Sequence, residues 1–132
     1  MVKDLSACIF APTSIGELID KITILQIKCE VLTGDSWINA QTELNMLQDC
    51  AKASKITPNP ELVRELKIVN QKLWRIEDQI REQEKNQDFG SKFIDLARSV
   101  YKTNDRRSEI KRSINISCGS HLIEEKSYED YS

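Results

Sequence analysis

Residues 62–115 read LVRELKIVNQKLWRIEDQIREQEKNQDFGSKFIDLARSVYKTNDRRSEIKRSIN and contain two amphipathic helical patterns separated by one short break. In the first pattern, apolar residues recur from Leu62 to Ile80 at alternating steps of four and three. This spacing indicates a helix with one apolar face. A second pattern runs from Phe93 to Ile114. Because the break at residues 86–90 is too short for anything but a tight reversal, we predict an antiparallel helical hairpin.

The hairpin has a well-defined start. Asn59 followed by Pro60 is typical of a helix N-cap and first turn, so we expect helices at about 60–86 and 91–117. Since both helices rise equally, folding about residues 87 and 88 places position i opposite roughly 175 minus i. Asn70 should therefore face Asn104, and Glu77 should face Arg98 or Tyr101.

Two further helices and one short strand are expected. Ser14 and Glu17 form a capping box that begins a helix over about 14–33, which is apolar on more than one side and ends at Gly34. A looser pattern predicts a helix over about 38–53, before the breaks at Pro58 and Pro60. Residues 5–11 have strand character, and we expect them to lie beside a tail over residues 120–132. The predicted fold is a single all-α domain over 1–132, a four-helix bundle-like arrangement built on the hairpin.

Composition excludes several classes of function. The chain has 132 residues and a net charge of -2, so it lacks the basic surface that nucleic acids or anionic membranes require. The apolar run at residues 7–12 is too short to span a bilayer, and we expect a cytoplasmic protein. No spacing among the four cysteines and the single histidine suits a metal ion. We therefore expect no metal and no cofactor.

Polar residues interrupt the apolar seam of the hairpin. On each helix they follow one ridge at helical spacing, and they form the candidate ligand-binding site: Trp74, Glu77, Arg81, Arg98, Tyr101, Asn104, Asp105 and Arg107. Two interpretations remain open. The asparagines could pair to fix the helix register while the charges form bridges, or the cluster could line a small polar groove. Three arginines near the seam exceed what Glu77 alone neutralises, which favours an anionic ligand.

Two other groups of charged residues can each be interpreted as a functional site or as part of the structure. Glu17, Asp20 and Lys21 resemble an acid–base cluster, but acidic residues near a helix N-terminus are explained by the helix dipole alone. A basic stretch on the last helix could hold a phosphate or be balanced by an acidic tail. The basic residues are Arg106, Arg107, Lys111 and Arg112, and the acidic ones are Glu124, Glu125, Glu129 and Asp130.

Several sequence words resemble a family of small uncharacterised helical proteins of bacteria and phages. They are PTSIGELIDKITIL (12–25), LWRIEDQIR (73–81), FIDLARSVY (93–101), the ND at 104–105 with Arg107, IKRSIN (110–115) and EEKSY (124–128). The resemblance covers nearly the whole chain and carries no catalytic residues. The family is associated with surface-polysaccharide genes, and this association favours a function in glycan biology. The words include the candidate site residues together with Asp20 and Asp78.

We expect a non-catalytic helical assembly or binding module whose polar seam holds an anionic small molecule or a partner's side chain. The alternative is a small all-α enzyme acting on an anionic metabolite, either chorismate mutase-like or nucleotide pyrophosphatase-like. The pyrophosphatase class needs repeated acidic pairs, and only Glu17 with Asp20 offers one here. Apolar residues outside the main stripe of the first helix, at Ile19, Ile24, Ile27 and Val31, predict a homodimer.

Overall fold

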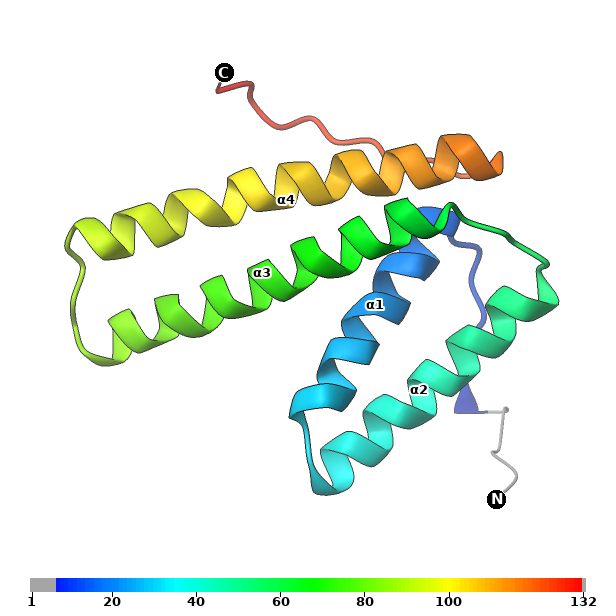
Figure 1. Ribbon diagram of the computed structural model, residues 1–132, viewed down its shortest axis with the longest axis horizontal. Coiled ribbons are helices and arrows are strands. Elements are labelled where there is room, and N and C mark those ends of the chain that lie inside the picture. The colour runs from blue at the N-terminus through cyan, green and yellow to red at the C-terminus, as the bar shows by residue number, and fades with distance from the viewer. Residues whose placement is uncertain (1–6, 132) are drawn as a thin grey trace.

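The computed structural model describes residues 7–131, and the regular structure in that range consists of four helices without a strand. They are α1 (Ile15–Val31), α2 (Gly34–Ala53), α3 (Pro60–Lys85) and α4 (Ser91–Cys118). Figure 1 shows two antiparallel pairs, α1 with α2 and α3 with α4, which diverge from the end where α3 begins. The all-α, four-helix prediction is confirmed. No helix over residues 7–131 has the length and apolarity needed to cross a membrane.

The α3–α4 hairpin forms as the sequence predicts. The Asn59 side chain caps α3 by accepting the Glu61 N–H at 2.8 Å, and the reversal closes where the Asp88 N–H donates to the Gln83 carbonyl at 2.9 Å. Across the hairpin, Arg106 pairs with Glu65 at 3.1 Å. The sequence estimate placed residue 110 opposite Glu65, so the observed register agrees to within about one helical turn.

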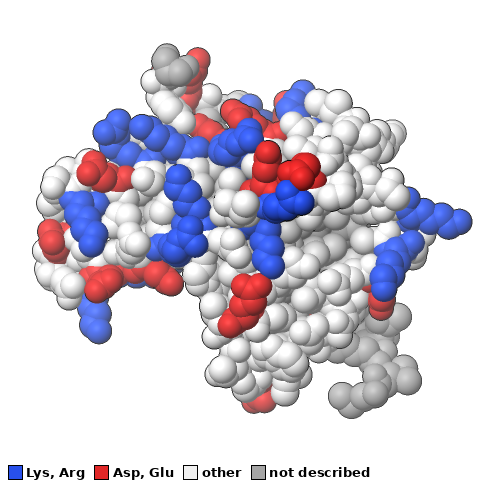
Figure 2. Space-filling model, in the orientation of Figure 1, with Lys and Arg blue, Asp and Glu red and all other residues white. Residues whose placement is uncertain are grey.

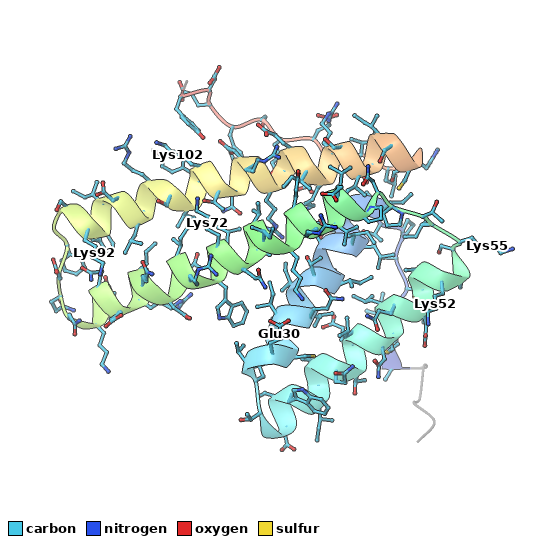
Figure 3. The ribbon with its side chains drawn as sticks, in the orientation of Figure 1. Glu30, Lys52, Lys55, Lys72, Lys92 and Lys102 are labelled. Carbon is cyan, nitrogen blue, oxygen red and sulfur yellow. The ribbon has the colours of Figure 1, made fainter. Side chains whose placement is uncertain are left out.

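Helix α1 is the central element, because it packs against all three other helices whereas α2 packs only against α1. Its buried residues Ile19, Ile22 and Leu25 join α2, α3 and α4 in one core, to which the other helices contribute Ala40, Leu44, Leu66, Ile110 and Ile114. Near the other end of α1, Glu30 points toward α3 and pairs with Lys67 at 3.1 Å (Figure 3). The far half of the hairpin extends beyond α1 (Figure 1).

The first turn of α1 is held closely against α4. The Ile15 N–H donates to the Ser120 hydroxyl at 3.1 Å, the Gly16 N–H to Asn115 Oδ1 at 2.6 Å and the Glu17 N–H to the Ser14 hydroxyl at 3.1 Å. These acceptors satisfy three of the N–H groups that a helix start leaves open. Glycine is needed at position 16 because a Cβ there would lie 2.5 Å from the Lys111 carbonyl oxygen.

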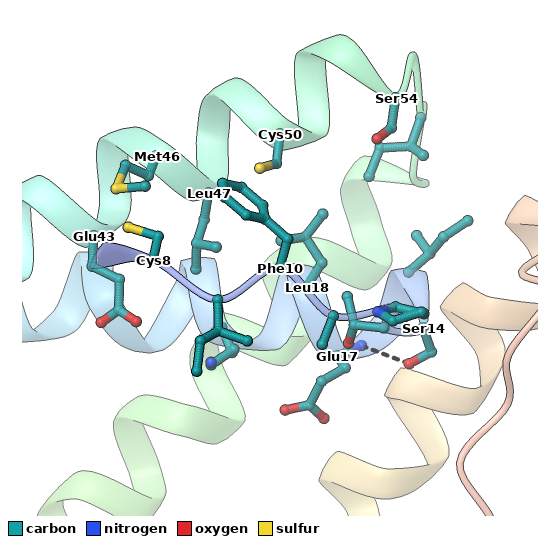
Figure 4. Close-up of a pocket in the computed structure, with 17 residues that line it drawn as sticks. Cys8, Phe10, Ser14, Glu17, Leu18, Glu43, Met46, Leu47, Cys50 and Ser54 are labelled. Carbon is teal, nitrogen blue, oxygen red and sulfur yellow. Dashed lines mark hydrogen bonds between the residues drawn. The ribbon is translucent and has the colours of Figure 1, made fainter. Parts of the chain in front are cut away.

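Three expectations about the first half of the chain were wrong. Residues 7–11 form no strand, since Pro12 ends the run and no partner strand satisfies its backbone; residues 5 and 6 lie outside the described range. The segment runs beside α2, as the cavity beneath it shows (Figure 4), rather than beside the tail near Leu122 and Ile123. Helix α2 begins at Gly34 instead of residue 38, because Gly34 adopts a φ of +62° and reverses the chain in a two-residue link.

Replacing Gly16 with alanine tests the close approach of α1 to α4. The added methyl group meets backbone that cannot rotate away, so Gly16→Ala should lower the free energy of unfolding by about 1–3 kcal/mol. Urea denaturation measures the change. Gly90→Ala is the matched control, because a Cβ there meets only the flexible Asp88 side chain at 3.3 Å. Equal stabilities for the two variants would contradict this packing.

Candidate functional site

A buried carboxylate on α1 lies where α1, α3 and α4 meet. Asp20 has no exposed surface, and its oxygens accept hydrogen bonds from two other helices. Asn70 Nδ2 of α3 donates at 2.9 Å and Arg107 Nε of α4 at 3.0 Å. Arg107 Nη2 also donates to the second oxygen, so the guanidinium group binds the carboxylate with two nitrogens. A buried charge is stable only with such partners.

The Asn70 amide completes this arrangement. Besides Asp20, its nitrogen donates to Thr23 Oγ1 at 2.9 Å, and the Thr23 hydroxyl in turn donates to the Asp20 backbone carbonyl at 2.8 Å. The expected pairing of Asn70 with Asn104 is therefore wrong. The predicted register considered only the two helices of the hairpin. It therefore could not show that α1 covers this part of α3 and supplies the partners of Asn70.

Lys111 extends the network toward the C-terminal tail. Its Nζ donates to Glu17 Oε2 at 2.6 Å and to Glu124 Oε2 at 3.0 Å, and it lies 3.7 Å from Asp20 Oδ2. Arg107 and Lys111 thus balance Asp20 and Glu17, while Glu124 is also paired with Lys126 at 3.4 Å. Glu17 and Asp20, the acidic pair that a magnesium-dependent reaction would need, are bound to these two cations.

The network stabilises the charged forms of Arg107, Lys111 and Glu124. The hydrogen bonds to Asp20 raise the pKa of Arg107. Burial works to lower the pKa of Lys111, but hydrogen bonds to Glu17 and Glu124 outweigh it and leave that pKa raised. The hydrogen bond from Lys111 lowers the pKa of Glu124. Each of these three shifts moves the pKa further from neutral pH. A general acid or base needs a pKa close to the working pH.

A groove of about 470 Å³ lies beside this network, between α4 and the C-terminal tail. The α4 side is lined by Val100, Tyr101, Asn104, Asp105, Arg107 and Ser108, and the tail side by Lys126, Tyr128, Glu129 and Tyr131. Its volume falls within the range of small-molecule sites. The expected balance between the basic stretch and the acidic tail is present in part, because Glu124 pairs with Lys111 and Glu125 pairs with Arg112.

The groove brings together half of the residues predicted from sequence. The four that line it are Tyr101, Asn104, Asp105 and Arg107. The other four, Trp74, Glu77, Arg81 and Arg98, are not among its lining residues. Glu77 pairs with Arg81 of its own helix at 3.8 Å. Tyr101 packs its ring against Tyr131 with centroids 5.1 Å apart. The expected excess of arginine charge is reduced, since Arg107 is bound to Asp20.

Sequence reasoning did not assign the buried part of the network to the site. Asp20, Glu17 and Lys111 were each explained by the helix dipole or by a solvated basic face. One signal was available: Gly16, Asp20 and Thr23 follow one another at helical spacing on a helix that is apolar on several sides. Small and polar residues on a covered face indicate close packing against a polar partner.

A second, larger cavity of about 720 Å³ lies beneath the segment before α1. Figure 4 shows Phe10 above it, between α1 and the side chains Leu47 and Cys50 of α2. Most of its lining is apolar, and none of the predicted site residues lines it. Within residues 7–131, no group of histidine, cysteine, aspartate and glutamate side chains is placed to hold a metal ion.

Substitutions at Asn70 test its role beside Asp20. Asn70→Ala should lower the free energy of unfolding by about 1–3 kcal/mol, because Asp20 and Thr23 lose a buried donor. Asn70→Asp should cost more, since it places a second carboxylate against Asp20. Urea denaturation of both variants provides the measurement. Asn104→Ala, at a half-buried position without a hydrogen bond in the described chain, should change stability by less than about 0.5 kcal/mol. Similar losses at both asparagines would restore the pairing of Asn70 with Asn104.

The tail contact of Tyr131 gives a prediction in alkaline solution. Its hydroxyl donates to Asp105 Oδ2 at 2.6 Å, and this hydrogen bond raises the pKa of Tyr131 from 10.0 to about 12. The contact is thus complete below pH 10 and is lost as the pH rises through 12. In a titration followed by tyrosinate absorbance, the step near pH 12 should disappear in Tyr131→Phe and move toward pH 10 in Asp105→Asn. A wild-type protein with no tyrosine titrating above pH 11 would contradict the contact.

Comparison with protein families identifies a relationship. A model for a family of unknown function (DUF6165) matches residues 11–131, which include all four helices and the tail. No curated protein matches the chain, and no solved structure does. The matched range contains the Asp20 network and the whole lining of the groove beside it. The chain therefore belongs to the DUF6165 family.

Proposed function

We propose that this protein is a non-catalytic helical binding module, whose groove between α4 and the tail holds an anionic small molecule or an acidic side chain of a partner protein. The observation that carries the proposal is the position of Arg107. Two of its nitrogens bind the buried Asp20, and the same side chain lines the groove. The third nitrogen, Nη1, makes no hydrogen bond within residues 7–131, so a fixed guanidinium group offers the two N–H groups of Nη1 to a ligand.

Other donors of the groove are also available. Over residues 7–131, the amide of Asn104 and the hydroxyl groups of Ser108 and Tyr128 make no hydrogen bonds to the protein. A ligand rich in acceptor oxygens would satisfy these donors. The lining carries two acidic residues, Asp105 and Glu129, and two basic ones, Arg107 and Lys126. Both basic residues are also paired with acids outside the lining, Arg107 with Asp20 and Lys126 with Glu124. Figure 2 likewise shows both signs interspersed along the hairpin. An anion is thus recognised by individual donors rather than by a broad positive field.

The pairing of the charged groups and the direction of their pKa shifts favour binding over catalysis. The acids and cations behind the groove are paired with one another, and the displaced pKa values of Arg107, Lys111 and Glu124 lead away from neutrality. Such pairs position side chains instead of exchanging protons. Tyrosine rings beside donors also suit a ligand that joins a phosphate to a ring, such as a sugar nucleotide. Sugar nucleotides also agree with the function in surface-polysaccharide biology that the family resemblance favours.

A ligand screen with two variants tests the proposal. Phosphates, sugar nucleotides and dicarboxylates are compared by thermal shift, and a ligand of the groove at 100 times its Kd should stabilise the protein by about 2.7 kcal/mol. Asn104→Ala should weaken that ligand's binding roughly fivefold by removing one hydrogen bond. Arg98→Ala is the matched control, because Arg98 is an exposed residue of α4 outside the groove. Equal weakening by both variants, or no stabilisation by any of the three classes, would contradict the proposal.

We further propose that the module is a homodimer, on a smaller surface than the sequence suggested. Ile19 and Ile27 are only 5% and 4% exposed within a single chain, so they do not need a partner. Val31 at the end of α1 remains 53% exposed and Ile38 in α2 54% exposed. Light scattering at high micromolar concentration should give a dimer mass that Ile38→Ser reduces and Ile94→Ser, at an equally exposed isoleucine of α4, leaves unchanged. A monomer mass for the wild type would contradict it.

A further inference from the structure

The C-terminal tail follows a defined path although it has no regular secondary structure. After Gly119, whose φ of +65° turns the chain, residues 121–131 run back along α4 (Figure 1). Close to the turn, the tail is attached by Glu124 to Lys111 and by Glu125 to Arg112, each at 3.0 Å. Two ion pairs therefore hold this end of the tail against α4.

The far end of the tail is attached by Tyr131. Its hydroxyl donates to Asp105 Oδ2 at 2.6 Å, and its ring packs edge-on against the Tyr101 ring at an interplanar angle of 73°. Both partners belong to α4 and line the groove. Between the two attachments, Lys126, Tyr128 and Glu129 form the outer wall of the groove. The groove therefore has this wall only while the tail is docked.

The attachments beyond Glu124 are individually weak. Tyr128 and Tyr131 remain 76% and 55% exposed, and exposed ion pairs and hydrogen bonds, such as those of Glu125 and Tyr131, contribute little to stability. Only Glu124 reaches a buried partner, Lys111. A segment held in this way exchanges between docked and released states at a small cost in free energy. Loss of a single contact should therefore change the docked fraction measurably.

We propose that the tail is a strap that closes the α4 groove, with Tyr131 on Asp105 and Tyr101 as its latch. This inference rests on the groove of the proposed function and adds how a ligand enters and is retained. A ligand that contacts both walls binds only the docked state, so strap closure and ligand binding stabilise each other. Releasing the latch should weaken binding in proportion to the docked fraction that is lost.

The experiment measures access to the groove without any ligand. Ser108 lines the groove, so full-length Ser108→Cys carries a thiol that the docked strap shields from an uncharged maleimide. Labelling rates at position 108 are resolved by peptide mass spectrometry, with the native Cys118 as the internal reference. Adding Tyr131→Phe removes the latch hydrogen bond and should speed the labelling roughly fivefold. Adding Tyr128→Phe is the matched control and should leave the rate unchanged, since the Tyr128 hydroxyl makes no hydrogen bond over the described range.

The outcomes separate the strap from the groove ligand. Faster labelling with Tyr131→Phe alone supports the latch, even if none of the screened ligands binds. Equal rates in all three proteins, or equal acceleration by the two tyrosine variants, would overturn it, even if a groove ligand is found. Circular dichroism of each variant checks that the helices are intact, and Asp105→Asn, which removes the other half of the latch, should reproduce the effect of Tyr131→Phe.

Discussion

The fold depends on the carboxylate of Asp20, which is buried between α1, α3 and α4. An isolated buried charge is strongly unfavourable, and breaking a buried pair typically costs about 3–5 kcal/mol. Asp20 avoids this cost only when α3 supplies Asn70 and α4 supplies both donor nitrogens of Arg107. Apolar contacts are not directional, whereas these hydrogen bonds require Asn70 and Arg107 to lie at defined positions beside Asp20. The close approach at Gly16 then fixes the end of α1 against α4.

The same interaction connects the fold to the proposed site. Arg107 is fixed by Asp20 on one side and lines the groove on the other, so the ligand would meet a side chain whose position is already determined. Lys111 similarly joins Glu17 of α1 to Glu124 of the tail. The core, the groove and its outer wall are thus linked through two cations of α4. Preorganisation of this kind lowers the entropic cost of binding.

The sequence predicted the helices better than the contacts between them. Periodicity identifies the apolar face of a helix, and the cap at Asn59 and the short reversal gave the bounds of α3 and α4 to within one residue. Four of the eight site residues gather because they share one face of α4. Arg98, also on α4, lies outside the groove. Trp74, Glu77 and Arg81 do not join it either, since a pattern on α3 does not show which neighbour covers it. Asp20 was missed for a related reason: a carboxylate near a helix start is usually explained by the dipole, and its partners are 50 and 87 residues away.

A double-mutant cycle between Asp20 and Arg107 tests this account most directly. Asp20→Asn, Arg107→Met and the double variant are compared with the wild type by urea denaturation, and the cycle isolates the energy of the pair from the effects of each substitution. If the buried pair fixes the packing of α1 on the hairpin, the coupling energy should be at least about 2 kcal/mol. The exposed pair of Glu77 with Arg81 should give less than about 0.5 kcal/mol in the same analysis. A coupling energy for Asp20 and Arg107 as small as that of the exposed pair would contradict the central role of the buried carboxylate.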